Sequence, residues 1–202
     1  MGDDAEVRHV GRVVVLNGAS STGKTTLAKA FSQARAEVGE CWLVLGIDDF
    51  NDLLPPQWVR AGGHEGTHGG DGLTVDPGAS PPVKVGELGQ RLFAAYRRTA
   101  ALWAAQGFDV VVDDVCFDEA AVRDWEAALA GVDVTWVAVR CAADTLDRRE
   151  SARGDRLLGL GRALATEVHR WAPVDMELDT SHATLDELCG QLSAYLDGRL
   201  PR

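Results

Sequence analysis

Residues 18–25 read GASSTGKT and match G-x-x-x-x-G-K-[ST] at every fixed position. Glycines let such a loop curl so that successive N–H groups face one anion, and the helix that follows points its positive end at the same place. An apolar run before the motif and a helical pattern after it favour a nucleotide site over a glycine turn that merely joins two elements. The predicted nucleotide-binding residues are Gly18, Ala19, Ser20, Ser21, Thr22, Gly23, Lys24, Thr25 and Thr26.

Two side chains of this motif have predicted chemical roles of their own. The Lys24 ammonium is expected to reach the β- and γ-phosphates of ATP, and the Thr25 hydroxyl to ligate Mg²⁺. Asp113 follows the apolar run VVV, which is the layout of an acid that holds Mg²⁺, so Thr25 and Asp113 are the predicted metal residues. Its neighbour Asp114 is assigned to substrate binding. The alternative for this acidic pair is the capping of the next helix.

A second acidic pair, Asp48 and Asp49, ends the apolar run LVLGI. A carboxylate that faces the γ-phosphate across a cleft can accept the proton of an attacking hydroxyl, or orient that hydroxyl. Either aspartate fits this catalytic role, and the hydrophobic periodicity does not choose between them. The alternative is a strand-end aspartate that caps the next turn.

The segment RRESARGDR holds four arginines. Arg153 and Arg156 flank a glycine, so both are predicted to move on a lid, at about residues 148–160, and to meet the charge that develops on a transferring phosphoryl group. Arg148 and Arg149 are predicted to lie at the surface. The competing interpretation is a solvated helix face with ion pairs to Glu150 and Asp155.

These residues need a scaffold, and the hydrophobic pattern predicts one. Strands alternate with helices, which indicates the α/β class with a parallel sheet covered on both faces, where ligands bind beyond the carboxyl ends of the strands. The predicted strands are residues 12–16, 41–47, 108–115, 132–140 and 176–181. The predicted helices are residues 24–38, 87–106, 119–130, 143–152, a further helix to about 171, and 184–196.

Residues 61–86 are rich in Gly and Pro and form a predicted acceptor-side loop, in which LTV is expected to make a small hairpin arm. Trp58 is predicted to line an aromatic substrate pocket beside it. The whole chain, residues 1–202, is interpreted as one domain.

The composition narrows the function classes. A net charge of −11 argues against broad affinity for nucleic acid or anionic lipid. No apolar run approaches the length of a membrane span, the first residues lack the pattern of a signal peptide, and the four cysteines are scattered without metal or redox spacing. These features predict a cytoplasmic protein with a small-molecule substrate, and they leave its oligomeric state open.

Six stretches together resemble the chloramphenicol phosphotransferase family of P-loop antibiotic kinases over nearly the whole chain. They are VVLNGASSTGKT, WLVLGIDDF followed by LLP, VVVDDV, DVTWVAVRC, RESARGDR and VDMELDTSH. The resemblance implies transfer of the γ-phosphoryl group from Mg-ATP to a hydroxyl of chloramphenicol or a related antibiotic, which confers resistance. It also implies a three-layer sandwich with a five-stranded parallel sheet in the order 2-3-1-4-5 and a small lid.

The resemblance assigns roles to particular residues. It places the general base on Asp48 in preference to Asp49, and the lid arginines on Arg153 and Arg156. It also implies that Asp179 and Thr180, in the loop after the last strand, lie near the adenine. Two other functions stay open: a kinase of the same fold for another hydroxylated metabolite, and a nucleotide-binding regulatory module that transfers no phosphate.

Overall fold

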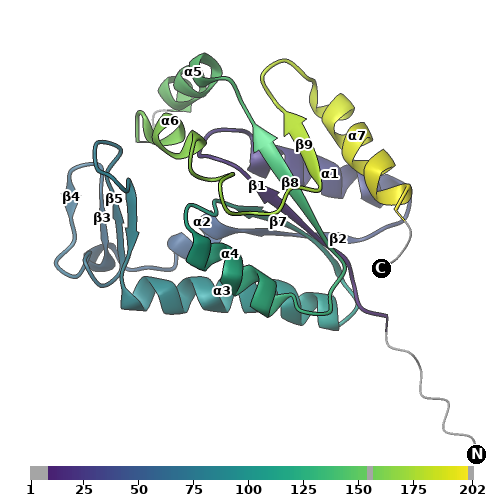
Figure 1. Cartoon of the computed structure of the whole chain (residues 1–202), viewed down its shortest axis with the longest axis horizontal. Helices are drawn as coiled ribbons and strands as arrows, with labels where there is room; N and C mark the ends of the chain where they lie inside the picture. The colour runs from purple at the N-terminus through teal and green to yellow at the C-terminus, as the bar shows by residue number, and fades with distance from the viewer. Residues whose placement is uncertain (1–8, 154–156, 200–202) are drawn as a thin grey trace, which may run out of the picture.

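A five-stranded parallel sheet forms the centre of the protein, in the computed structural model that describes residues 9–153 and 157–199 (Figure 1). Its strand order is β2-β7-β1-β8-β9, which is 2-3-1-4-5 when these strands alone are counted along the chain, so the predicted order is confirmed. The strands are β1 (Val13–Asn17), β2 (Trp42–Gly46), β7 (Asp109–Asp114), β8 (Val134–Arg140) and β9 (Met176–Asp179).

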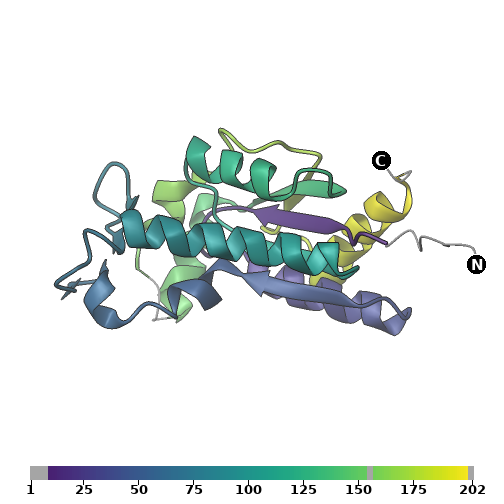
Figure 2. The same cartoon turned by 90° about the horizontal axis from the view of Figure 1, so that it is seen from below.

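Helices cover both faces of this sheet (Figures 1 and 2). On one face α1 (Lys24–Glu37) packs against α7 (Leu185–Asp197), and on the other α3 (Glu87–Ala105) packs against α4 (Glu119–Ala128). Side chains of β1 alternate between the two cores, with Val13 and Val15 beside α3 and α4 and Val14 and Leu16 beside α1 and α7. Burial on both faces explains why the central strands are continuous apolar runs.

The strand register gathers the site at one end of the sheet. Leu16 and Asn17, the last residues of β1, pair with Asp113 and Asp114 of β7. Gly46, the last residue of β2, also pairs with Asp113. Three strand ends therefore meet where the phosphate motif begins, because parallel strands present their carboxyl ends at the same edge.

A second, smaller sheet replaces the long loop expected at residues 61–86. Its order is β4-β3-β5-β6, with β3 parallel to β5 and the other two pairings antiparallel. The strands are β3 (Val59–Ala61), β4 (His64–Glu65), β5 (Leu73–Val75) and β6 (Val83–Val85), after the short 3₁₀-helix η1 (Pro56–Trp58). The LTV arm is confirmed as β5, but it belongs to a mixed sheet rather than to a lone hairpin.

Three further helices surround the end of the main sheet where the site lies: α2 (Ile47–Asn51), α5 (Ala143–Arg153) and α6 (Leu160–Ala165). The helix expected to run to about residue 171 ends at Ala165 and continues as turns. Its Val168 carbonyl accepts a hydrogen bond from Asn17 Nδ2 at 2.5 Å instead of continuing a helical ladder. Within the described ranges, no helix has the length and apolar composition to cross a membrane.

The edge beside β2 carries a charge cluster that makes a testable contribution to stability. Glu40 accepts hydrogen bonds from Arg35 at 2.6 Å, Trp42 at 3.0 Å and Arg12 at 3.2 Å. The Arg35 hydrogen bond is the main cause that lowers the pKa of Glu40 from 4.5 to about 2. Because the folded pKa is lowered, the contribution is present above about pH 4.5 and is lost as the pH falls towards 2.

Replacing Glu40 with glutamine is therefore expected to lower the free energy of unfolding at pH 7 by about 1 kcal/mol, since the carboxylate is partly exposed and screened by solvent. The difference from wild type should narrow between pH 4.5 and 2. Urea denaturation at several pH values measures both effects. Glu37→Gln, on an exposed residue at the end of α1, is the control; equal losses in the two variants at pH 7 would contradict the assigned role of the cluster.

Candidate phosphate and acceptor site

The phosphate motif forms a tight loop between β1 and α1. A Cβ at Gly18 would lie 2.4 Å from the Val139 carbonyl oxygen, so this position requires glycine. Gly23 at φ 94° and Ser21 at φ 64° adopt the left-handed conformation that turns successive N–H groups inward. Helix α1 begins with no side-chain cap and no acidic residue in its first turn. Its first N–H groups are thus available to an anion.

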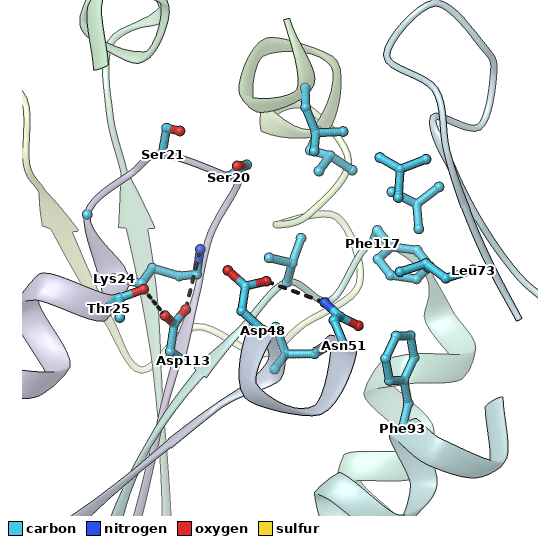
Figure 3. A pocket seen from close by; sticks show the side chains of 17 residues that line it. Ser20, Ser21, Lys24, Thr25, Asp48, Asn51, Leu73, Phe93, Asp113 and Phe117 are labelled. Atoms are coloured by element: carbon cyan, nitrogen blue, oxygen red, sulfur yellow. Dashed lines mark hydrogen bonds and ion pairs between the residues drawn. The ribbon is translucent and has the colours of Figure 1, made fainter. Parts of the chain in front are cut away.

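Lys24, Thr25 and Asp113 lie together at the head of this loop (Figure 3). The Lys24 ammonium is buried, donates to the Ala19 carbonyl at 2.9 Å and lies 3.6 Å from Asp113 Oδ1. The Thr25 hydroxyl donates to the other oxygen of the Asp113 carboxylate. The sequence predicted Thr25 and Asp113 to share a role, and the fold brings them into contact although they are 88 positions apart.

The loop opens into a pocket with two chemically different ends (Figure 3). Lys24, Thr25 and Asp113 form one end, Asp48 and Asn51 lie in the middle, and the far end is apolar. The space between its lining residues, about 770 Å³, includes open solvent. Its apolar lining is Ile47, Leu73, Val75, Val83, Phe93, Val115, Phe117, Leu160 and Leu164.

The two aspartates after β2 separate in the structure. The strand ends at Gly46, and both residues lie in the first turn of α2 rather than on the strand end. Both aspartates are exposed, but Asp48 lines the pocket and accepts a hydrogen bond from Asn51 at 3.4 Å, whereas Asp49 is not among the lining residues. The hydrophobic periodicity did not distinguish the two aspartates as candidates for the catalytic role. In the structure only Asp48 of the two lines the pocket.

The structure does not bring Asp114 and Trp58 to the pocket. Asp114 is fully buried beneath α4, where it accepts hydrogen bonds from the Trp125 indole and from the Val115 N–H at 2.7 Å. Burial raises the pKa of Asp114, against the lowering effect of the nearby Arg97 charge. Trp58 stacks on His68 at 4.8 Å within the small sheet region. Neither side chain is among those that line this pocket, so its geometry does not support the predicted substrate contact by these two.

Thr180 contacts the phosphate loop directly, and also through Arg149, which was expected at the surface. The Thr180 hydroxyl donates to the Thr22 carbonyl at 2.6 Å. Arg149 donates to the Thr22 carbonyl at 3.1 Å and to the Thr180 hydroxyl and carbonyl at 3.0 and 2.8 Å. Arg149 thus ties α5 and the end of β9 to the loop. The three parts are far apart along the chain and meet only in the folded protein, so no sequence spacing signals the arrangement.

Two further predicted nucleotide-binding residues, Asp179 and Thr26, are exposed to solvent. Asp179 is exposed at the end of β9, where hydrogen bonds from the Ser181 hydroxyl and N–H lower its pKa. Thr26 is exposed in the first turn of α1.

Asn17 was not predicted as a site residue, but it is buried beside the phosphate loop. Its Oδ1 accepts a hydrogen bond from the Cys116 N–H at 2.9 Å. The sequence did contain a signal for this role of Asn17: it is a polar residue at the end of an apolar strand, directly before the glycine motif.

Glu150 is buried and connects α5 to the start of α6, so it is not part of a solvated face. Its side chain is 1% exposed and accepts hydrogen bonds from the N–H groups of Gly159 at 2.8 Å and Gly161 at 2.7 Å. A Cβ at Gly161 would lie 2.7 Å from the Ser20 carbonyl oxygen, so α6 begins directly against the phosphate loop. Of the predicted lid arginines, Arg156 and the side chain of Arg153 lie outside the described residues.

Replacing Glu150 with glutamine is expected to leave at least one of these buried N–H groups without an acceptor. The free energy of unfolding should fall by about 1–3 kcal/mol. Urea denaturation measures the loss, and amide hydrogen exchange at Gly159 and Gly161 locates it. Glu126→Gln, on the exposed face of α4, is the matched control. Unchanged exchange at both glycines would show that Glu150 does not hold this segment.

Comparisons with known proteins agree with this geometry. The family model described as chloramphenicol phosphotransferase-like protein matches residues 11–197. The chain belongs to this family. A Mycobacterium tuberculosis protein named "Putative O-phosphotransferase" is 35% identical over 195 residues, which cover 90% of this chain and 80% of that protein. The chain is therefore a small-molecule kinase, an O-phosphotransferase.

Solved structures of kinases share the fold of this chloramphenicol phosphotransferase-like protein at low sequence identity. The APS kinase CysC of M. tuberculosis, in complex with AMPPNP and APS, has a TM-score of 0.64 at 16% identity, over 93% of this chain and 98% of its own. A gluconokinase from Sinorhizobium meliloti has a TM-score of 0.56 at 15% identity, over 94% and 93%. These likenesses establish the P-loop kinase architecture alone.

Proposed function

We propose that this kinase transfers the γ-phosphoryl group of ATP to a hydroxyl of chloramphenicol or a related antibiotic, and so confers resistance to it. The single observation that carries the proposal is the two-ended pocket, with the phosphate loop at one end, an apolar wall at the other and Asp48 between them (Figure 3). Such a pocket fits an uncharged alcohol with an apolar body.

The loop end supplies the nucleotide site. The backbone of residues 18–26 and the Lys24 ammonium hold the phosphates, with Asp179 and Thr180 beside the adenine. The side chain of Ser21 supports a ligand here, because its hydroxyl is buried without a hydrogen-bond partner among the described residues. Thr25 and Asp113 offer adjacent hard oxygen donors, which fit Mg²⁺. Bound there, the ion neutralises charge on the phosphates.

The transfer step assigns Asp48 as the general base. Its carboxylate takes the proton of the acceptor hydroxyl as that oxygen bonds to the γ-phosphorus, and the bond from the γ-phosphorus to the β–γ bridging oxygen breaks to release ADP. Lys24 stabilises the charge that shifts to the leaving diphosphate. Arg153 and Arg156 are assigned to the equatorial oxygens of the transferring group.

The alternative acceptor is another hydroxylated metabolite or natural product. The apolar wall weighs against strongly anionic acceptors, because a charged group placed against those apolar side chains would lose its hydration. An uncharged natural product with a primary hydroxyl remains compatible with this wall. The two candidate functions therefore differ in the acceptor molecule and share the same phosphoryl-transfer reaction.

The test is an incubation of the purified protein with Mg-ATP and chloramphenicol, followed by mass spectrometry for the drug with one added phosphoryl group. Phosphorylated drug is the expected result. Slow ATP hydrolysis without phosphorylated drug would reject chloramphenicol as the acceptor and favour the alternative, which a screen of hydroxylated natural products would then identify.

A further inference from the structure

Asn51 occupies the point where the polar and apolar ends of the pocket meet (Figure 3). It lies three residues after Asp48 in α2, so the two side chains share one face of the helix. Its Nδ2 donates to Asp48 Oδ1 at 3.4 Å. Exchanging the amide oxygen and nitrogen would set a carbonyl oxygen against the carboxylate, so the hydrogen bond fixes this orientation.

The other atom of the same amide has no partner. Asn51 Oδ1 is buried and accepts no hydrogen bond from any residue that the structure describes. Leu73 and Ile47 line the pocket with it and offer no donor side chain. A buried carbonyl oxygen without a donor costs free energy, and a ligand that supplies an N–H or O–H group removes that cost.

We propose that Asn51 selects the acceptor: its Oδ1 accepts a hydrogen bond from an N–H or O–H group on one of the two carbons that follow the one carrying the reacting hydroxyl. Its Nδ2 meanwhile orients the carboxylate of Asp48. The inference rests on the proposed function and deepens it. The acceptor is then an amido alcohol or a diol with an apolar body, and a plain apolar alcohol is a poor substrate.

Chloramphenicol is a suitable probe, because the carbon beside its primary alcohol carries an amide N–H and the next carbon carries a hydroxyl. Two analogues remove these donors without adding bulk: an ester in which oxygen replaces the N–H, and the deoxy compound that lacks the secondary hydroxyl. The kcat/KM of the wild type should fall about 10- to 100-fold for the analogue that has lost the donor bound by Asn51.

Variants then connect the lost donor to Asn51. In Asn51→Leu, chloramphenicol and that analogue should have nearly equal, low kcat/KM values, since the acceptor oxygen is gone. Asn51→Asp keeps an acceptor oxygen and should retain the discrimination even where its rate is lower. Asp52→Asn, on the next and exposed residue outside this pocket, should discriminate as the wild type does.

Each outcome decides the inference. It is overturned if the wild type uses both analogues as well as chloramphenicol, or if Asn51→Leu still discriminates. Should Asn51→Leu fail to fold, as judged by thermal melting, Asn51→Ala replaces it, and the wild-type comparison stands without any variant. If the wild type phosphorylates none of the three compounds, the proposed function fails and the inference falls with it. Phosphorylation without discrimination contradicts the inference alone.

Discussion

Lys24→Ala should reduce ATP turnover by about 10³-fold, because the ammonium is the buried cation at the point where charge develops on the β- and γ-phosphates. The neighbouring Asp113 carboxylate, 3.6 Å away, would also lose its cation and repel the nucleotide. Release of ADP under saturating Mg-ATP measures the change.

Lys29→Ala provides the control for Lys24→Ala, since Lys29 lies on the exposed face of the same helix and should keep wild-type turnover. Thermal melting of both variants separates a loss of turnover from a loss of fold. Near-normal turnover by folded Lys24→Ala would overturn the assignment of the phosphate loop.

Asp48→Asn should retain nucleotide binding and lose phosphoryl transfer, by about 10²–10⁴-fold, because an amide has nearly the shape of the carboxylate but cannot accept the hydroxyl proton. Mass spectrometry of the phosphorylated drug measures transfer, and equilibrium binding of a fluorescent ATP analogue measures affinity. A fall in kcat at unchanged nucleotide affinity is the expected pattern.

The neighbouring substitution Asp49→Asn makes a close control for Asp48→Asn. Asp49 belongs to the same helical turn but lies outside the pocket lining, so its variant should transfer phosphate at the wild-type rate. Full activity in Asp48→Asn would exclude the general-base role. Equal losses in the two variants would point to damage of α2 instead.

Much of the scaffold follows from local sequence signals. Continuous apolar strands, helical spacing and the glycine motif predict the main sheet, and the family resemblance supplies its strand order. The contact between Thr25 and Asp113 was also foreseeable, because the motif and a strand-end acid converge in any parallel sheet of this order.

Other features depend on tertiary contacts that no local pattern encodes. The strands of the second sheet are two or three residues long, too short for alternation to show among glycines and prolines. Arg149 and Glu150 lie in a charged stretch whose sequence is typical of a solvent-exposed helix face. In the structure Arg149 binds the phosphate loop and the Glu150 side chain is buried. Asp114 is a buried strand end whose side chain turns to Trp125, a direction set by the packing of α4.

The division of the pocket between two sheets has a consequence for how such a protein changes over time. The loop after β1, Thr25 of α1 and Asp113 of β7 belong to the main α/β core, whereas Leu73, Val75 and Val83 come from the small sheet inserted between α2 and α3. Mutations within residues 59–85 can thus remodel the acceptor wall while leaving the phosphate machinery intact. Substitutions in this insert should therefore change which alcohol fits the pocket more than they change how the phosphates are held.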